Sequence, residues 1–501
     1  MFKRHGLAGA ILAIVLLVGV SAVGTGGAST GDTKRHLVVF AGDYAVDGTY
    51  AVDGGYAVLC NYAVLNGYAV GCNYAVAHDY AVSLVEAAGG TVASDMLSQI
   101  GVLTVDSANA LFADVMRTSA VVQEVGRDFA PSRVPGGDPE PINDPGEPLQ
   151  WDMQQISVPD AHPIQGGSPR VDVGVLDSGI DGNHADFKKG GVSNVDCSRG
   201  HNSVTFLPTG PGVGTPDPCT DNQFHGTHVA GTIAARANGI GIVGVAPNVT
   251  LIPVKVCDTS GYCYASAVVD GITYAGDQKF EVINMSFFVD DNEFQESTEF
   301  KCMDDPAQRA FRRAVERALQ YARNQGVVPV AALGNSDEDL AHPSEPNENN
   351  CDVVPAESAG VIGTSALGSR SEKAGYSNYG TGANDVSAPG GNGTTGDCTT
   401  TILSTIPGGY LCIQGTSMAS PHAAGVAALI VSQFGTLGPD GDVKMSPTAV
   451  ESIMQGTTVD IGLSGYDECF GHGRIDAFRA VRKSTSRAFD SAAPHCPEYG
   501  E

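Results

Sequence analysis

The chain has 501 residues, of which 42% are hydrophobic and 17% are charged. This length exceeds one ordinary domain, so we expect two or three folded units around a sizeable core. The formal net charge of −28 at pH 7 excludes nucleic acid and anionic membrane surfaces as partners, because no basic patch could outweigh it.

The first 22 residues have the pattern of a secretory signal peptide. Lys3 and Arg4 precede an apolar run over 7–20, and small residues at 20–22 suit a cleavage site. A membrane anchor is the alternative, but the run is short and no second apolar span follows it. We therefore expect a secreted, extracellular protein without a stable membrane anchor.

Residues 35–128 are predicted to form a small α+β unit. Its expected elements are strands at 36–40, 100–105 and 121–125, and helices at 81–88 and 108–118. The following segment, 129–148, is rich in Pro, Gly and Asp and is predicted to be an exposed linker, where a maturation cleavage would fall.

Inside this unit, Tyr-Ala-Val recurs every six residues between positions 44 and 82. In an extended chain this period would place every Tyr and Val on one face. The repeat is then either a small β-coil or adhesive segment, or an expanded surface loop between a strand and a helix. We favour the loop, because so few hexads bury little core.

Between residues 149 and 482, apolar strand-like runs alternate with helical patterns. The expected strands lie at 171–176, 250–256, 282–286, 327–332 and 361–365. Such alternation predicts a parallel sheet covered by helices on both faces. Residues 483–501 are expected to be a C-terminal tail.

Twelve cysteines suit disulfides in an oxidising compartment, and the chain has no Cys-x-x-Cys pair of the kind that binds zinc. Pairing near neighbours gives Cys197–Cys219, Cys257–Cys263, Cys302–Cys351, Cys398–Cys412 and Cys469–Cys496.

Three motifs supply the parts of a nucleophilic set. Asp177 ends a strand-like run, the motif HGTHVAGT begins at His225, and GTSMASPH contains Ser417. Peptide hydrolysis needs an activated hydroxyl, a base to take its proton and a carboxylate to orient that base. Other interpretations exist for these residues. Ser417 could be only a helix N-cap, and His225 and His228 could be a pair of metal ligands. Asp181 is the alternative to Asp177 as the acidic residue.

In these motifs and their order, residues 150–482 resemble the subtilisin-like serine proteases, or subtilases. The resemblance implies a subtilisin-like parallel sheet with His225 as the base, and makes His228 a structural residue. It also implies that Asn335 and the Ser417 amide form the oxyanion hole. The unit at 35–128 resembles the ferredoxin-like inhibitor propeptide of this family, which occupies the active site until it is cut away.

The resemblance also places a substrate-binding strand at 283–286, with Ser286, Phe287, Phe288, Leu333 and Gly334 as candidate binding residues. Phe287 and Phe288 stand where the family has Leu and Gly, and Leu333 stands where a small residue is usual. We expect a crowded pocket with altered specificity rather than lost activity. Pro355 matches a turn near this pocket and is a candidate cis proline.

A structural Ca²⁺ site is a further implication of the resemblance. Its ligands would be Asp186, the Asn238 side chain and three carbonyl groups, with Glu147 as a possible addition; the carbonyls belong to Arg236, Ile240 and Ile242. Hard oxygen ligands suit Ca²⁺, and the alternative is an ordinary loop without an ion.

The leading hypothesis is a secreted, monomeric serine endopeptidase made as a self-processing zymogen. It would act on protein or peptide substrates, with its own propeptide as an intramolecular inhibitor. Two alternatives come from other classes: a catalytically impaired subtilase-fold binding protein, and a surface or adhesive protein that uses the hexad repeat.

Overall fold

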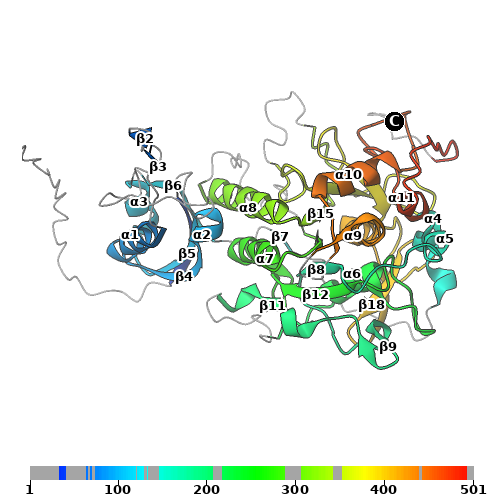
Figure 1. Cartoon of the computed structure of the whole chain (residues 1–501), viewed down its shortest axis with the longest axis horizontal. Coiled ribbons are helices and arrows are strands. Elements are labelled where there is room, and N and C mark those ends of the chain that lie inside the picture. Colours follow the sequence, from blue (N-terminus) through cyan, green and yellow to red (C-terminus); the bar gives the residue numbers. More distant parts are fainter. Residues whose placement is uncertain are drawn as a thin grey trace, which may run out of the picture.

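The computed structural model describes eleven stretches of the chain (Figure 1): 33–40, 64–65, 68–69, 74–119, 121–128, 132–133, 146–206, 217–287, 306–341, 352–438 and 443–493. The predicted signal peptide, most of the hexad repeat and most of the predicted linker lie outside these residues.

A seven-stranded parallel sheet forms the centre of the larger part of the molecule. Its strands, in spatial order, are β11 (His201–Asn202), β12 (Thr250–Lys255), β8 (Asp172–Asp177), β14 (Val282–Met285), β15 (Val328–Ala332), β16 (Ile362–Leu367) and β17 (Val386–Pro389). The predicted strands agree with β8, β12, β14, β15 and β16 to within two residues at each end. Their continuous apolar runs follow from burial on both faces.

Helices cover both faces of this sheet (Figure 1), as predicted. One face carries α7 (Ala265–Gln278) and α8 (Pro306–Asn324), and the other carries α6 (His225–Ala234) and α9 (Thr416–Phe434). Successive side chains of β8 point to opposite faces of the sheet and so join two separate hydrophobic clusters. Val175 packs in the α6–α9 cluster and Leu176 in the α7–α8 cluster.

Smaller elements complete this part. The helices are α4 (Trp151–Gln155), α5 (Val158–Ala161), α10 (Pro447–Gly456) and α11 (Ala477–Val481), with 3-10 turns at Glu147–Leu149, Ala185–Phe187, Cys197–Arg199 and Ser203–Phe206. The strand pairs are β9 (Lys188–Lys189) with β10 (Val192–Ser193), β18 (Ile402–Ile406) with β19 (Gly409–Ile413), and β20 (Thr436–Leu437) with β21 (Val443–Lys444). The described part of the tail docks on this domain, since the N–H of Asp490 donates to the carbonyl of Asp460.

The small unit is a four-stranded antiparallel sheet with helices. It contains β1 (Lys34–Phe40), α1 (Tyr74–Ala87), β4 (Gly90–Met96), α2 (Leu97–Ile100), β5 (Val102–Ser107), α3 (Phe112–Arg117) and β6 (Val122–Arg127). The strand order β4-β5-β1-β6, with α1 and α3 as the two connecting helices, is the ferredoxin-like arrangement. The sequence missed β4, whose residues lack an apolar alternation.

Helix α1 begins at Tyr74, earlier than predicted, so the last two copies of the hexad repeat are helical rather than part of a loop. Two other described pieces, β2 (Val64–Leu65) and β3 (Tyr68–Ala69), pair as a short antiparallel ladder. The same hexad therefore adopts two conformations, because neighbouring structure overrides a weak local preference.

The small unit packs its sheet against α8 of the larger domain (Figure 1). In β1, Val38 and Phe40 lie in the core of the small unit, whereas Leu37 and Val39 join the hydrophobic cluster of α7 and α8. Both faces of β1 are thus buried, which explains its unbroken apolar run.

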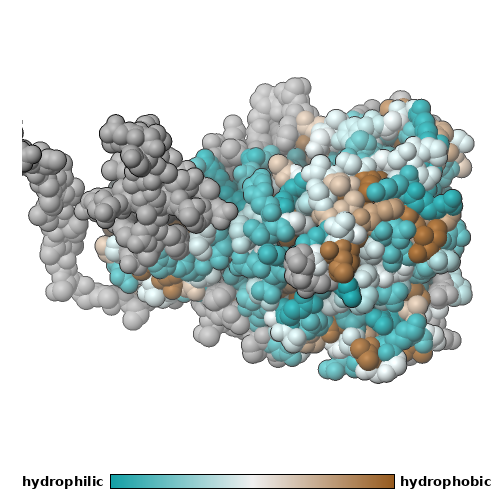
Figure 2. All heavy atoms as spheres, viewed as in Figure 1, coloured by the Kyte–Doolittle hydropathy of each residue, from teal (hydrophilic) through white to brown (hydrophobic). Residues whose placement is uncertain are grey.

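On the face shown in Figure 2, hydrophilic residues cover most of the described surface, and hydrophobic residues are scattered in small groups. None of the helices in the described stretches is both long enough and apolar enough to cross a bilayer.

Candidate active site

The carboxyl ends of the central strands bring the predicted residues together. β8 ends at Asp177, Ser286 follows β14, and Asn335 comes shortly after β15. These strands are parallel neighbours, so their ends share one edge of the sheet. Helices α6 and α9, which carry His225 and Ser417 in their first turns, pack against each other beside this edge.

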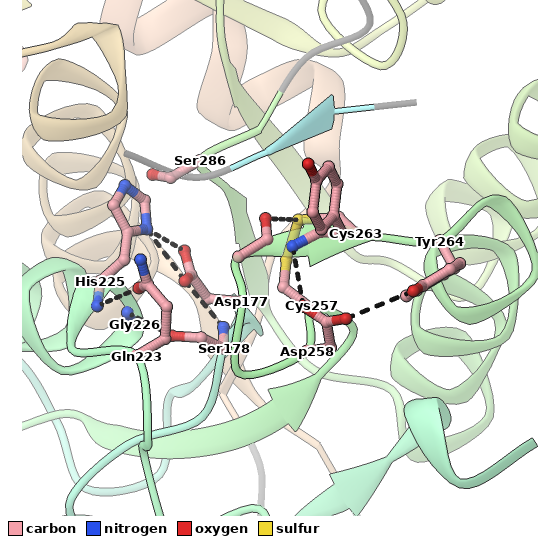
Figure 3. Close-up of a disulfide and its surroundings, with 12 residues drawn as sticks. Asp177, Ser178, Gln223, His225, Gly226, Cys257, Asp258, Cys263, Tyr264 and Ser286 are labelled. Atoms are coloured by element: carbon pink, nitrogen blue, oxygen red, sulfur yellow. Dashed lines mark hydrogen bonds and ion pairs between the residues drawn. A yellow bond between two sulfur atoms is a disulfide. The ribbon is translucent and has the colours of Figure 1, made fainter. Parts of the chain in front are cut away.

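Asp177 and His225 form a buried pair (Figure 3). His225 Nδ1 lies 2.9 Å from both carboxylate oxygens of Asp177, and neither side chain is exposed. The carboxylate also accepts the N–H of Ser178 at 2.7 Å. A carboxylate at Nδ1 keeps the proton on that nitrogen and leaves Nε2 as the basic atom.

A second buried carboxylate, Asp221, fixes the start of α6. Its Oδ1 accepts from the Ser178 hydroxyl at 3.0 Å and from the N–H groups of Gln223 and Phe224. Its Oδ2 accepts from the N–H of Thr227 at 2.9 Å and from the Thr227 hydroxyl at 2.6 Å. Sequence reasoning missed Asp221, although an acidic residue just before a helix is a recognisable signal.

Helix α6 approaches the loop after β8 so closely that position 226 accommodates only glycine. A Cβ on Gly226 would lie 2.1 Å from the carbonyl oxygen of Gly179. Just before the helix, Phe224 has a φ of 93°, a left-handed conformation that costs a bulky residue about 1–3 kcal/mol. The close approach at Gly226 and the left-handed conformation of Phe224 together place His225 against Asp177.

Ser417 lies in the first turn of α9 and is 1% exposed. Its hydroxyl donates to the carbonyl of Ser286 at 3.1 Å. His225 Nε2 has no hydrogen-bond partner among the described residues. In the view of Figure 3 the His225 ring is drawn between Asp177 and Ser286, the residue whose carbonyl accepts the Ser417 hydroxyl.

Asn335 is oriented by Thr416, which precedes Ser417. Asn335 Oδ1 accepts both the N–H of Thr416, at 2.8 Å, and its hydroxyl, at 2.9 Å. The Thr416 oxygen in turn accepts the N–H of Gly334 at 3.1 Å. Two donors at Oδ1 fix the orientation of the amide, so the Nδ2 group is the part of the side chain that can donate to another acceptor. Thr416 belongs to the GTS motif, but the sequence analysis gave it no role.

The predicted substrate-binding segment is tied to α9 as well. The Ser286 hydroxyl accepts from Asn284 Nδ2 at 2.9 Å and donates to the Ser417 carbonyl at 2.8 Å. Phe287 and Leu333 are buried in the α7–α8 cluster. Phe288 lies outside the described residues. The Val354–Pro355 peptide bond is cis, as the sequence suggested.

The remaining candidate polar residues have structural partners. His228 Nε2 contacts the carbonyl oxygens of Ile402 and Leu411, which makes His228 a link between α6 and the β18–β19 pair. Asp181 accepts the N–H of Asn183 within a turn. Neither side chain takes the place proposed for His225 or Asp177.

His422, in the second turn of α9, is in a buried ion-pair geometry with Asp152. Its Nε2 lies 2.9 Å from Asp152 Oδ2, and both side chains are unexposed. Sequence spacing gave no signal for this pair, because the partners are 270 residues apart in the chain.

Asp186 is the centre of the predicted calcium site. Its Oδ2 accepts the N–H of Ile242 at 2.8 Å, whereas the buried Oδ1 has no hydrogen-bond partner among the described residues. Burial raises the pKa of Asp186. An orphaned buried carboxylate oxygen fits a cation ligand.

Two of the other residues expected at the calcium site make hydrogen bonds to nearby protein groups. Asn238 Oδ1 accepts the N–H of Ile240 at 3.0 Å, and the N–H of Arg236 donates to the Asp186 carbonyl at 2.7 Å. Across the described stretches, no cluster of three or more His, Cys, Asp or Glu suits a metal ion. The side chain of Glu147 lies outside the described residues.

Three of the predicted disulfides are present: Cys197–Cys219, Cys257–Cys263 and Cys398–Cys412. Cys469 is also disulfide-bonded. Its expected partner, Cys496, and the predicted pair Cys302–Cys351 lie outside the described residues.

A short strand from the predicted linker lies near this site. β7 (Ser132–Arg133) pairs antiparallel with β13 (Tyr262–Cys263), with Ser132 opposite Cys263. Asp128, at the end of the small unit, accepts the N–H and hydroxyl of Ser266 at the start of α7, at 3.0 and 2.6 Å.

Comparison with known proteins places this geometry in a family. Residues 169–473 match the Subtilase family. Subtilisin DY of Bacillus licheniformis is 34% identical over 314 residues, covering 62% of this chain and 91% of the relative. Subtilisin of Bacillus pumilus is 32% identical over 339 residues, covering 67% of this chain and 99% of the relative. The chain belongs to the subtilase family.

This subtilase is accordingly a serine-type endopeptidase with a subtilisin-like fold. The epidermin leader peptide processing serine protease of Staphylococcus aureus superimposes with a TM-score of 0.64 at 20% identity, covering 91% of this chain and 99% of that chain. A lanthipeptide protease gives a TM-score of 0.53 at 25% identity, covering 67% of this chain and 95% of that chain. The first similarity extends well beyond residues 169–473 of this subtilase.

Proposed function

We propose that this subtilase is a secreted endopeptidase that hydrolyses proteins through Ser417, His225 and Asp177. The observation that carries the proposal is the buried His225–Asp177 pair, whose Nε2 has no hydrogen-bond partner among the described residues. A serine in the first turn of the adjacent helix supplies the hydroxyl that such a base serves.

In the proposed reaction, the Ser417 hydroxyl turns from the Ser286 carbonyl to His225 Nε2. His225 takes the proton as Ser417 Oγ bonds to the scissile carbonyl carbon, and then returns it to the leaving amine. Water then attacks the acyl carbon while His225 Nε2 takes its proton; the bond from that carbon to Ser417 Oγ breaks, His225 returns the proton to Oγ, and the carboxylic acid product leaves. Asp177 keeps the imidazole oriented and stabilises its charged form.

We assign stabilisation of the oxyanion to Asn335 Nδ2 and the Ser417 N–H. The orientation of Asn335 by Thr416 supports this role, because Oδ1 is occupied and Nδ2 is free to donate to substrate. Ser417 also lies at the N-terminus of a 19-residue helix, where the helix dipole favours negative charge.

Residues 35–128 are proposed to be an inhibitory propeptide that is cut from the domain at 149–482 within the linker 129–148. Two contacts support the proposal: β1 contributes Leu37 and Val39 to the core of the protease domain, and β7 pairs with β13 close to the site. The disulfides and the pattern of residues 1–22 support secretion.

We further propose that Phe287, Phe288 and Leu333 narrow the substrate pocket. The supporting observation is that Phe287 directly follows Ser286, whose hydroxyl donates to the Ser417 carbonyl, and that Phe287 and Leu333 both fill the α7–α8 cluster behind this segment. A Phe288→Gly variant should widen the range of side chains accepted from a peptide library. An unchanged cleavage profile would remove this assignment.

The proposed Ca²⁺ ligands are Asp186, Asn238 and the carbonyls of Arg236, Ile240 and Ile242. The orphaned Asp186 Oδ1 is the supporting observation. Bound there, the ion would cross-link the loop after β8 to the loop after α6 and add stability.

Expression of the full chain and of its Ser417→Ala variant tests the proposed activity. The native chain should cleave itself within 129–148 and react with a fluorophosphonate, whereas Ser417→Ala should do neither. A native chain that stays unprocessed and unlabelled would refute the endopeptidase proposal.

A further inference from the structure

The hairpin around Cys257 and Cys263 connects the candidate active site to the pairing edge β13. Cys257 follows β12, and its N–H, with that of Val256, donates to the carbonyl of Asp177. Cys263 belongs to β13, which pairs with β7. The disulfide joins these two positions across a sequence separation of 6 (Figure 3).

The turn between the two cysteines is held by Asp258. Asp258 Oδ1 accepts the N–H groups of Ser260, at 2.8 Å, and Tyr262, at 3.0 Å. The N–H of Asp258 donates to the Tyr262 carbonyl, and Tyr264 reaches Asp258 Oδ2 at 3.3 Å (Figure 3). The hairpin therefore has one covalent and several polar restraints.

We propose that the Cys257–Cys263 disulfide is a positioning element that holds β13 in register with Asp177, so that an extended peptide pairing with β13 reaches Ser417. The proposal rests on the proposed function and adds a determinant of peptide binding to it. Both cysteines are fully buried. The bridge is therefore shielded from thiols and acts as a permanent brace rather than as a redox switch.

The physical reason is that an edge strand binds by backbone hydrogen bonds, whose strength depends on its alignment. β13 has only two residues and no partner in the main sheet. Without the bridge, the peptide itself must order the strand, and the cost of that ordering reduces affinity.

The test compares the self-matured native enzyme with a Cys257→Ala/Cys263→Ala variant on two substrates: a tetrapeptide amide that spans β13, and a single-residue ester that cannot reach it. KM for the tetrapeptide should rise about tenfold, or about 1.4 kcal/mol, the order of one net backbone hydrogen bond. The ester kinetics and the fluorophosphonate labelling rate should stay within about twofold.

The matched control is Cys398→Ala/Cys412→Ala, which removes a bridge with a separation of 14 residues. Its longer loop should cost at least as much stability through chain entropy. Equal rises in tetrapeptide KM in both variants, equal losses for ester and tetrapeptide, or an unchanged tetrapeptide KM would each overturn the proposal.

If the double-alanine variant fails to fold, Asp258→Ala keeps the bridge and loosens the same turn. The Asp258→Ala variant should also raise the KM for the tetrapeptide and leave the ester kinetics unchanged. An unchanged KM for the tetrapeptide would count against the proposal.

If the native chain proves inactive, the proposed function fails and the brace is still tested in the full-length Ser417→Ala chain. Removing the bridge should then speed hydrogen exchange at 258–264, whereas equal protection with and without it would refute the brace.

Discussion

Thr416 illustrates how a single hydroxyl controls a neighbouring polar group. It donates to Asn335 Oδ1 and accepts from the N–H of Gly334, so it joins the start of α9 to the segment after β15. The Thr416 N–H makes the second bond to Asn335 and is independent of the side chain. Removing the hydroxyl should therefore loosen the Asn335 side chain without releasing it.

We expect Thr416→Val to lower kcat about tenfold with little change in KM, because one net hydrogen bond contributes about 0.5–1.5 kcal/mol. Asn335→Leu should lower kcat more, about 10²–10³-fold, as found for loss of an oxyanion-hole donor in a subtilisin. Steady-state kinetics on a peptide amide measure both effects. Thr457→Val is the control, since its hydroxyl bonds within α10; an equal kcat loss there would contradict the assignment.

Asp186 is the residue on which the calcium proposal depends. Chelation of Ca²⁺ should lower the Tm of the Ser417→Ala chain, and Asp186→Asn should abolish this response, because the ion stabilises only the folded state. Calorimetry with and without EDTA measures it. Asp337→Asn, whose carboxylate is 59% exposed, serves as the control. A Tm that EDTA leaves unchanged in the native sequence would contradict a calcium site.

At the scale of elements, α6 is held by partners on three sides: Asp177, Asp221 and the β18–β19 pair. The last contact runs through His228, whose Nε2 must donate to the carbonyls of Ile402 and Leu411. Burial, the largest cause, lowers the pKa of His228 to about 3. The folded protein therefore keeps this imidazole neutral.

This contact should make stability depend on pH. Above the unfolded pKa of about 6.5 the imidazole is neutral in both the folded and the unfolded chain. Below this pH only the unfolded chain takes the proton. The free energy of unfolding therefore decreases as the pH is lowered from about 6.5 towards the folded pKa of about 3. At pH 5 the loss is about 2 kcal/mol. We expect His228→Gln in the Ser417→Ala chain to reduce the fall in Tm between pH 7 and 5.

His201→Gln is the comparison for that experiment, because His201 is partly exposed and pairs with Asp270 at the surface. An unchanged pH slope in His228→Gln, measured by calorimetry, would show that the acid sensitivity arises elsewhere.

At the scale of the whole molecule, Arg317 of α8 joins the two folded units. Its guanidinium donates to the carbonyls of Phe40 and Ile100, at 2.9 and 3.2 Å, and to Gln123 at 2.6 Å. Arg313 adds an ion pair with Glu124 at 3.2 Å. These polar contacts surround the apolar side chains that β1 contributes to the protease core.

We expect Arg317→Met in the Ser417→Ala chain to release the small unit at lower urea concentration. Two backbone carbonyls would lose their donor, at a cost of about 1–3 kcal/mol. Hydrogen exchange of β1 and β5 across a urea series measures the release. Arg312→Met is the control, because Arg312 pairs with Glu316 and Asp352 within its own domain. Identical curves for the two variants would contradict a joining role for Arg317.

Periodicity and motif spacing were sufficient to predict the main parallel sheet, the two helix-covered faces and a small α+β unit before them. The ferredoxin-like arrangement of that unit was implied by the family resemblance and not by the periodicity. Apolar runs buried on both faces, such as β8 and β15, carry a strong signal in the sequence itself. β4 and β17 were missed because short or polar strands depend on their neighbours for stability.

For the site, the sequence alone determined which residues we propose to carry the chemistry, because Asp177, His225 and Ser417 stand in extended motifs that one reaction explains. Only the tertiary structure decided how they are held. Asp221, Thr416 and the Asp152–His422 pair act across the fold, and hydrogen bonds between residues distant in sequence leave no periodic pattern. The same holds for the pairing of β7 with β13, since the register of two separate strands is set by the packing around them.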